Sequence, residues 1–191
     1  MTDMTPHYRL ERATSENELL SMLETAWMKE VQDLGESEDY AQPQLEHARR
    51  IVGDGFPNYG IYVLHDGKEQ YVGMLHANTA RIPKTSGLTL RLNWILLSPL
   101  YDFEEVSEEE FARVSAGILF GAVRLAQTDE MKAHHVKVHL NNMGDKQFAR
   151  GVAYTMFEHG SAAQVGVRGN WLHLDNVRPQ GGGEHELRRV L

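Results

Sequence analysis

Apolar residues recur every three or four positions in four stretches of the chain, and this spacing is typical of helices packed on a core. In two of these stretches Ser and Glu stand three residues apart at the start, which is the spacing of a capping box. The two pairs are Ser15 with Glu18 and Ser107 with Glu110. We therefore expect helices over 15–34, 44–55, 107–125 and 146–160.

Apolar and polar residues alternate in other stretches, as they do in strands with one buried face. Asp66 and Gly67 stand between two apolar runs and predict a hairpin turn. The stretch 88–97 alternates at first and then becomes continuously apolar, which is typical of a strand that enters a covered sheet. The expected strands are 8–13, two within 59–82, 88–97, 134–140 and a last hairpin across 168–170.

The order of these elements is β-α-α-β-β-β-α-β-α-β-β. It predicts an α+β fold with a mixed, mostly antiparallel central sheet and helices on both faces. We expect a single domain over 1–178 and a flexible, glycine-rich tail over 179–191. Docking of the apolar tail residues on a second copy of the chain, giving a homodimer, is one interpretation of this tail, and disorder is the other.

Composition narrows the function classes. The chain has 191 residues, 41% of them apolar and 24% charged, as in an ordinary globular protein. It has no cysteine, which excludes disulfides and thiolate zinc sites. A net charge of −8 argues against general nucleic-acid binding, although it leaves room for a local basic patch. Without an apolar leader or a run long enough for a membrane span, we expect a cytoplasmic protein with no membrane partner.

The stretch 93–111 reads as a buried strand, an acidic loop and a helix start. Such a junction often binds anions, because free backbone N–H groups and the helix dipole favour negative charge there. This loop has no glycine and carries several carboxylates, which also suit a solvated first turn or a basic partner. They are Asp102, Glu104, Glu105, Glu108, Glu109 and Glu110.

Over roughly 8–177 this order of elements resembles the GNAT superfamily (Gcn5-related N-acetyltransferases). The resemblance implies that acetyl-CoA or another acyl-CoA is a co-substrate and lies where the fourth strand splays from the fifth. It places the pantetheine along the end of the strand and the pyrophosphate at the following helix. The residues that it implies for CoA binding are Leu96, Leu97, Ser98, Arg113, Ser115 and Gly117.

Two features depart from the family pattern. The glycine positions of the pyrophosphate motif fall near Arg113 and Ser115, and the loop before them is acidic. The missing glycines and the acidic loop support an alternative in which the chain is a GNAT-shaped binding or assembly module without CoA chemistry. The acyl-homoserine-lactone synthases are a third comparison, but "ILLSPLYDF" lacks the arginine of their motif on this strand.

Acyl transfer to an amine needs an acid for the leaving thiolate and a base, or a water path, for the ammonium proton. The resemblance makes Tyr154 the candidate acid; the alternative is a helix tyrosine whose ring packs on the sheet and whose hydroxyl lies at the edge. His76 is the candidate base, with an ordinary half-buried histidine as the alternative. Asn93 is a candidate for hydrogen bonding to substrate. A second acidic loop, which contains Glu36, Glu38 and Asp39, would suit a cationic amine acceptor. This acceptor could be a small molecule or a peptide.

The histidines at 134, 135 and 139 invite a metal interpretation. On a strand, however, His135 and His139 stand about 13 Å apart along the backbone, which is too far for one ion. We therefore predict no metal site.

Overall fold

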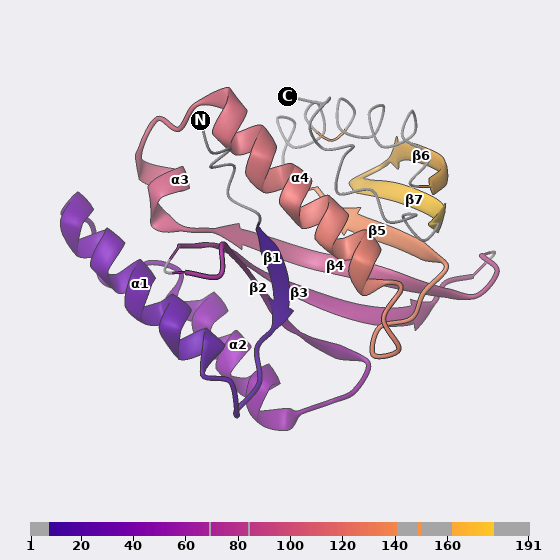
Figure 1. Ribbon diagram of the computed structural model, residues 1–191, viewed down its shortest axis with the longest axis horizontal. Helices are drawn as coiled ribbons and strands as arrows, with labels where there is room; N and C mark the ends of the chain where they lie inside the picture. Colours follow the sequence, from indigo (N-terminus) through magenta and orange to yellow (C-terminus); the bar gives the residue numbers. More distant parts are fainter. Residues whose placement is uncertain (1–7, 69, 84, 141–148, 150–161, 178–191) are drawn as a thin grey trace. The chain divides into compact units, whose positions relative to one another are not determined.

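The computed structural model describes residues 8–68, 70–83, 85–140, 149 and 162–177 (Figure 1). Seven strands form one sheet in the order β1-β2-β3-β4-β5-β7-β6. The strands are β1 (Arg9–Arg12), β2 (Tyr59–His65), β3 (Tyr71–Arg81), β4 (Leu88–Leu97), β5 (His135–His139), β6 (Ala162–Arg168) and β7 (Trp171–Val177). The helices are α1 (Leu19–Leu34), α2 (Gln42–Asp54), α3 (Pro99–Phe103) and α4 (Glu108–Leu125).

The sheet is mixed: β4 and β5 are parallel, whereas β1 pairs with β2, and β7 with β5 and β6, in antiparallel fashion. The predicted α+β fold, with the order of elements that the GNAT resemblance implies, is confirmed over these residues. The helix expected over 146–160 lies outside the described residues, apart from Ala149. No helix of the described part of the chain is long and apolar enough to cross a membrane.

The chain forms two compact units. The first comprises Met1–His76 and Ile95–Gly121, and the second comprises Ala77–Trp94 and Ala122–Leu191. The single domain expected over 1–178 stays a prediction.

The core of the first unit forms around α1, which buries the apolar residues predicted from its spacing. Leu23 and Trp27 are almost fully buried, and the Trp27 indole N–H donates to the Tyr71 carbonyl of β3 at 2.7 Å. Helix α4 approaches the edge strand β1 through small residues. A Cβ added at Gly121 would lie 2.8 Å from the Cβ of Leu10, so glycine sets the distance between this helix and this strand.

In the second unit, strands β4, β5, β7 and β6 have one apolar and one polar face, because successive side chains of a strand alternate. The apolar face is buried. It is formed by Leu90, Leu92, Val136, Val138, Leu172 and Leu174. The hairpin of β6 and β7 turns at Gly169, which has a left-handed φ of 62° within the predicted 168–170 turn.

Two predictions of local structure were wrong. Helix α1 begins at Leu19, so Ser15 is not its cap; Glu18 has a left-handed φ of 52°, and no side chain of that residue caps the helix. Instead, the Asn17 side-chain oxygen accepts from the Leu19 N–H at 3.3 Å and from the Thr14 N–H at 3.0 Å. Asn competes well for such N–H groups because its short side chain bonds readily to nearby backbone.

The second wrong prediction concerns the stretch 93–111, in which only a loop was expected between the strand and the long helix. The structure has the short helix α3 there. Pro99 stands at its first position, where proline's fixed φ favours helix entry. Five residues are too few for apolar periodicity to show, so the sequence pattern gave no signal for this helix.

Candidate functional site

Among the residues that the structure describes, the ladder between β4 and β5 ends within β4. Their register runs from Thr89 opposite His135 to Leu92 opposite Val138. Strand β4 continues for five more residues, to Leu97. The separation of the two strands that the GNAT resemblance implies stays a prediction, because residues 141–148, which follow Leu140, lie outside the described part of the chain.

The end of β4 carries the residues expected to contact pantetheine. Leu96 and Leu97 are half-buried, whereas Ser98 is 2% exposed and donates its N–H to the Val72 carbonyl at 3.1 Å. A Cβ on Gly73 of β3 would lie 3.4 Å from the Leu96 carbonyl oxygen, so the two backbones are close.

The Ser98 hydroxyl is bonded inside the protein rather than presented to a ligand. It bonds the carboxylate of Glu30 on α1, which also accepts from the Leu100 N–H at 3.4 Å. Burial raises the pKa of Glu30 even though both of these hydrogen bonds favour its charged form. The Glu30 carboxylate therefore links helix α1 to the end of strand β4 by hydrogen bonds.

One side chain, that of Ser107, caps the start of α4. The Ser107 hydroxyl accepts from the Glu110 N–H at 3.2 Å, which confirms the serine half of the predicted capping box, whereas the Glu110 carboxylate bonds other side chains. One oxygen of the Glu110 carboxylate accepts from the hydroxyls of Tyr8 at 2.8 Å and Tyr101 at 3.1 Å. Its other oxygen accepts from Arg113 at 2.6 Å. Glu110 is thus the anion of a four-residue cluster.

This cluster occupies the region implied for the pyrophosphate. Arg113 also pairs with Glu109 at 3.0 Å, so two carboxylates neutralise the one cation expected to bind phosphate. Burial, followed by the bond to Glu110, raises the pKa of Tyr8, and burial and the charge of Glu110 raise the pKa of Tyr101. Both phenols therefore stay neutral donors over the physiological pH range.

The other two residues implied for the pyrophosphate differ in their surroundings. Ser115 is half-buried on α4. Gly117 packs against the first strand region, since a Cβ there would lie 3.3 Å from the Cβ of Tyr8. The structure therefore gives Gly117 a packing role.

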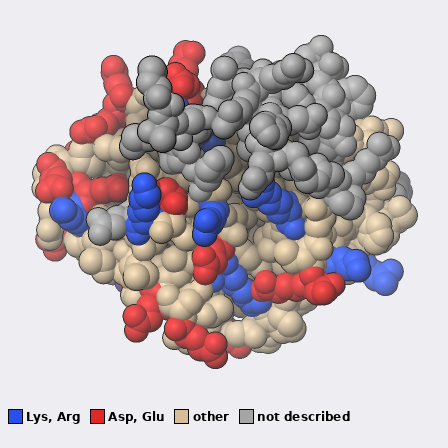
Figure 2. Space-filling view, viewed as in Figure 1, with Lys and Arg blue, Asp and Glu red and all other residues tan. Residues whose placement is uncertain are grey.

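The loop after α1 is acidic and exposed, as expected for Glu36, Glu38 and Asp39. Figure 2 shows carboxylates gathered at the upper left, where α3 and the start of α4 lie in Figure 1. Tyr40 ties this loop to the strand end: its hydroxyl donates to Asp102 at 2.7 Å and lies 3.1 Å from the Leu97 carbonyl oxygen.

His76, the candidate base, is half-buried on β3. Its ring centroid lies 5.9 Å from that of His47 on α2 and 5.4 Å from that of Tyr59, both in edge-on geometry. In the second unit, the Asn93 amide donates to the Asn78 side-chain oxygen at 2.8 Å. Tyr154, the candidate acid, lies outside the described residues.

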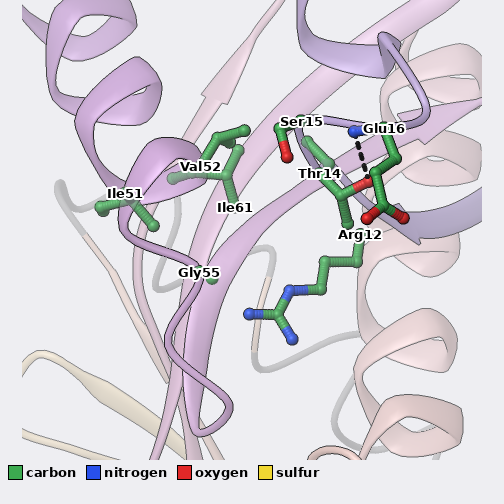
Figure 3. A pocket seen from close by; sticks show the side chains of 10 residues that line it. Arg12, Thr14, Ser15, Glu16, Ile51, Val52, Gly55 and Ile61 are labelled. Carbon is green, nitrogen blue, oxygen red and sulfur yellow. Dashed lines mark hydrogen bonds between the residues drawn. The ribbon is translucent and has the colours of Figure 1, made fainter.

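Two hollows mark the surface of the first unit. The smaller, about 250 Å³, lies among the end of β1, the following loop and the end of α2 (Figure 3). The Arg12 guanidinium on its wall donates to the carbonyls of Phe56 and Tyr59, so it closes the end of α2. The larger, about 650 Å³, is lined by Glu30, Asp66, Lys68 and Gln70.

His135 of β5 has a structural role. His135 is buried, with Nε2 2.8 Å from the Ser86 carbonyl oxygen and Nδ1 2.9 Å from the Asp175 carboxylate. The described residues contain no group of three or more His, Asp or Glu placed to hold a metal ion.

Sequence reasoning missed the tyrosines at 8 and 101 and the role of Glu110. Only the Glu110 to Arg113 spacing was visible, because residues three apart on a helix are neighbours. Tyr8 is 102 residues from Glu110, so nothing local could have paired them.

No family model matches the chain, and no curated protein matches it. Solved structures do resemble it. One is a predicted acetyltransferase with acetyl-CoA from Clostridium acetobutylicum, at 11% identity over 76% of this chain and 88% of that one, with a TM-score of 0.43. Another is an aminoglycoside N(6')acetyltransferase from Legionella pneumophila, at 10% identity over 90% and 94%, with a TM-score of 0.45. A third is a spermidine N-acetyltransferase chimera from Vibrio cholerae, at 11% identity over 89% and 96%, with a TM-score of 0.46. At such identities and TM-scores the likeness assigns no activity to this chain.

Proposed function

We propose that the chain is an acyl-CoA-dependent N-acyltransferase that transfers an acetyl group to an amine. The observation that supports this proposal is that the β4 to β5 ladder, within the described residues, ends five residues before β4 does. A strand that continues past its partner offers backbone N–H and C=O groups, which bind an extended ligand as an added strand would. The amide-bearing pantetheine arm of CoA is such a ligand.

The fit to the phosphates is poorer. In this structure the Glu110 carboxylate, and not a free N–H or a free cation, faces Arg113 and the two phenols. Pyrophosphate would approach this helix start only if Glu110 turned away or if the phosphates lay to the side of it.

In the proposed reaction the amine nitrogen attacks the thioester carbonyl carbon, the C–S bond breaks, and the thiolate takes up a proton. His76 is proposed to remove the ammonium proton, and its neighbour His47, which is exposed, offers a path for that proton to solvent. Tyr154 is proposed to protonate the thiolate. Glu36, Glu38 and Asp39 remain the proposed contacts for the cationic end of the acceptor.

Titration calorimetry of the purified protein with acetyl-CoA and with CoA tests this directly. We expect dissociation constants below about 100 μM, which corresponds to roughly 5.5 kcal/mol. The absence of binding at millimolar ligand would end the proposal. Turnover assays of His76→Gln and Tyr154→Phe would follow, with the exposed His134→Gln as the matched control.

A second candidate function is a GNAT-shaped binding module without catalysis. The Glu110 cluster favours it, because the resident carboxylate consumes the donors a phosphate would need. The same calorimetry separates the two candidates.

A further inference from the structure

Three side chains that can carry positive charge stand in one row across the strands of the second unit. Arg91 of β4 is directly opposite Lys137 of β5, which in turn is directly opposite His173 of β7. Directly opposed residues of paired strands have their side chains on the same face of a sheet, so these three lie together on the polar face. We name them the cationic row. All three are half-buried, and all belong to the second unit.

The cationic row is unfavourable for the fold by itself. Like charges that stand directly opposite one another on paired strands are destabilising, and Arg91 and Lys137 are such a pair. Within the described part of the chain, neither of them forms an ion pair with a carboxylate. Proteins retain such unfavourable arrangements mainly where function requires them. This pair is therefore a candidate site for an anion from outside the chain.

The surroundings of the cationic row are positive as well. Burial, followed by the charges of Lys137 and Arg168, lowers the pKa of His173, and Asp175 opposes this only in part. The Asp175 carboxylate is engaged in the adjoining row, because it lies 2.9 Å from Nδ1 of His135 and 4.0 Å from Arg168. The chain as a whole carries −8, so this positive region differs from the rest of the molecule.

An aromatic side chain holds the first member of the row in place. The Arg91 guanidinium carbon lies 5.1 Å from the centre of the Trp171 ring, which is close enough for a cation–π interaction. The His139 ring approaches Trp171 edge-on from β5, with its centroid 4.9 Å away. The guanidinium is therefore positioned before a ligand binds, which lowers the entropic cost of binding.

The row ends in open space on β6. Gly166 stands directly opposite His173, so it continues the row by one position. Among the described residues, no heavy atom lies within 4 Å of a Cβ built on Gly166. A ligand that binds the three cations therefore has room to extend over this glycine.

We propose that the cationic row binds a phosphate group, either inorganic phosphate or the phosphate of a small monoester whose organic part extends over Gly166. A phosphate monoester carries a charge of about −1.5 to −2 near pH 7 and has three strong acceptor oxygens. It can therefore accept from the Arg91 guanidinium, the Lys137 ammonium and the His173 imidazole together. The site lies wholly within the second unit, and the inference does not depend on acyl transfer.

Calorimetric titration of the purified protein with inorganic phosphate and with ribose 5-phosphate tests this inference, and ribose without phosphate is the control ligand. We expect saturable binding of at least one of the two phosphates and none of ribose. Lys137→Gln should weaken this binding at least about tenfold, because a charge-assisted hydrogen bond is lost. Lys132→Gln removes the same charge from an exposed position of the same unit and serves as the matched control. Binding that is absent, that Lys137→Gln leaves unchanged, or that both variants weaken equally overturns the inference.

Gly166→Val distinguishes the two sources of phosphate, because it keeps all three cations and adds bulk where the space is open. If the ligand is a monoester, this variant should weaken binding of ribose 5-phosphate at least about fivefold through steric conflict and leave binding of inorganic phosphate unchanged. Unchanged binding of both would exclude an organic part over Gly166 and assign the site to inorganic phosphate.

Thermal melts provide a readout that does not depend on calorimetry. Without phosphate, Lys137→Gln should be at least as stable as the wild type, because the repulsion between Lys137 and Arg91 is removed. Phosphate should raise the melting temperature of the wild type more than that of the variant, since a ligand of the folded state stabilises it. A variant that melts clearly below the wild type without phosphate, or equal upward shifts with phosphate, would overturn the inference. None of these measurements uses CoA, so failure of the proposed function would leave them unaffected.

Discussion

Replacing Glu110 by Gln tests whether this carboxylate is the anion around which the start of α4 is built. The substitution keeps the shape of the side chain and removes its charge. Glu110 accepts hydrogen bonds from Tyr8, Tyr101 and Arg113, and its side chain is 24% exposed. Hydrogen bonds to a charged group contribute about 1.5–3 kcal/mol each, but the amide oxygen retains one or two of them, so we expect a net loss of about 1–3 kcal/mol of unfolding free energy.

Glu109→Gln is the matched control, because it removes one charge from the same first turn and pairs with the same Arg113. Its side chain is 70% exposed and makes a single pair four residues along the helix. Such pairs contribute about 0.3–0.5 kcal/mol. Urea denaturation monitored by circular dichroism measures both variants, and the helix-dipole contribution, common to both, cancels in the comparison.

The same variant has a second readout. If Glu110 occupies the place of the pyrophosphate, Glu110→Gln should bind acetyl-CoA more tightly than the wild type although it is less stable. Equal destabilisation by Glu109→Gln and Glu110→Gln would refute the structural part of this reasoning. A clear stability loss with unchanged or weaker acetyl-CoA binding would refute the placement of the phosphates.

Three further predictions concern the first unit. Tyr8 has a raised pKa, so its stabilising effect is complete below the ordinary value of about 10 and is lost as pH rises above it; Tyr8→Phe should show a shallower fall in unfolding free energy between pH 9 and about 11 than the wild type. Burial raises the pKa of Glu30, so this group lowers the unfolding free energy once pH rises above its ordinary range, and Glu30→Gln should leave the melting temperature unchanged or higher at pH 7, with the gain disappearing below about pH 4, where the wild-type carboxyl is protonated; a clear fall at pH 7 would contradict this. Gly121→Ala should cost about 1–3 kcal/mol because its Cβ would press on Leu10, whereas Gly53→Ala, with open space around it, should stabilise α2 by about 0.5–1 kcal/mol; equal effects in thermal melts would exclude the packing argument.

The sequence pattern predicted the long elements and failed where side chains from distant segments decide. Strand β4 came out with its predicted bounds, because ten residues of strand periodicity and an apolar end give a strong signal. The start of α1 was misplaced since both Ser15 and Asn17 are good caps, and only the backbone conformation at Glu18 selects between them.

The candidate site shows the same limit. The position of the junction between β4 and α4 could be predicted from the order of strand, loop and helix, because the topology fixes it, whereas anion binding at this junction stays a prediction. The side chains that occupy this junction could not be predicted. The hydrogen bond between Tyr8 and Glu110 depends on the pairing of β1 with β2, which joins distant segments of the chain. The row of Arg91, Lys137 and His173 likewise depends on strand register, which single-sequence periodicity does not give.

Tyr40 has a consequence for local unfolding. Its hydroxyl joins Asp102 and the Leu97 carbonyl, and its ring packs edge-on between Trp27, at 6.2 Å, and Phe103, at 5.6 Å. The loop after α1, helix α3 and the last residue of β4 therefore share one aromatic anchor. In native-state hydrogen exchange we expect the amides of α3 and the 36–40 loop to open together, as one cooperative segment with a common opening free energy. A ligand that orders either segment would then slow exchange in the other.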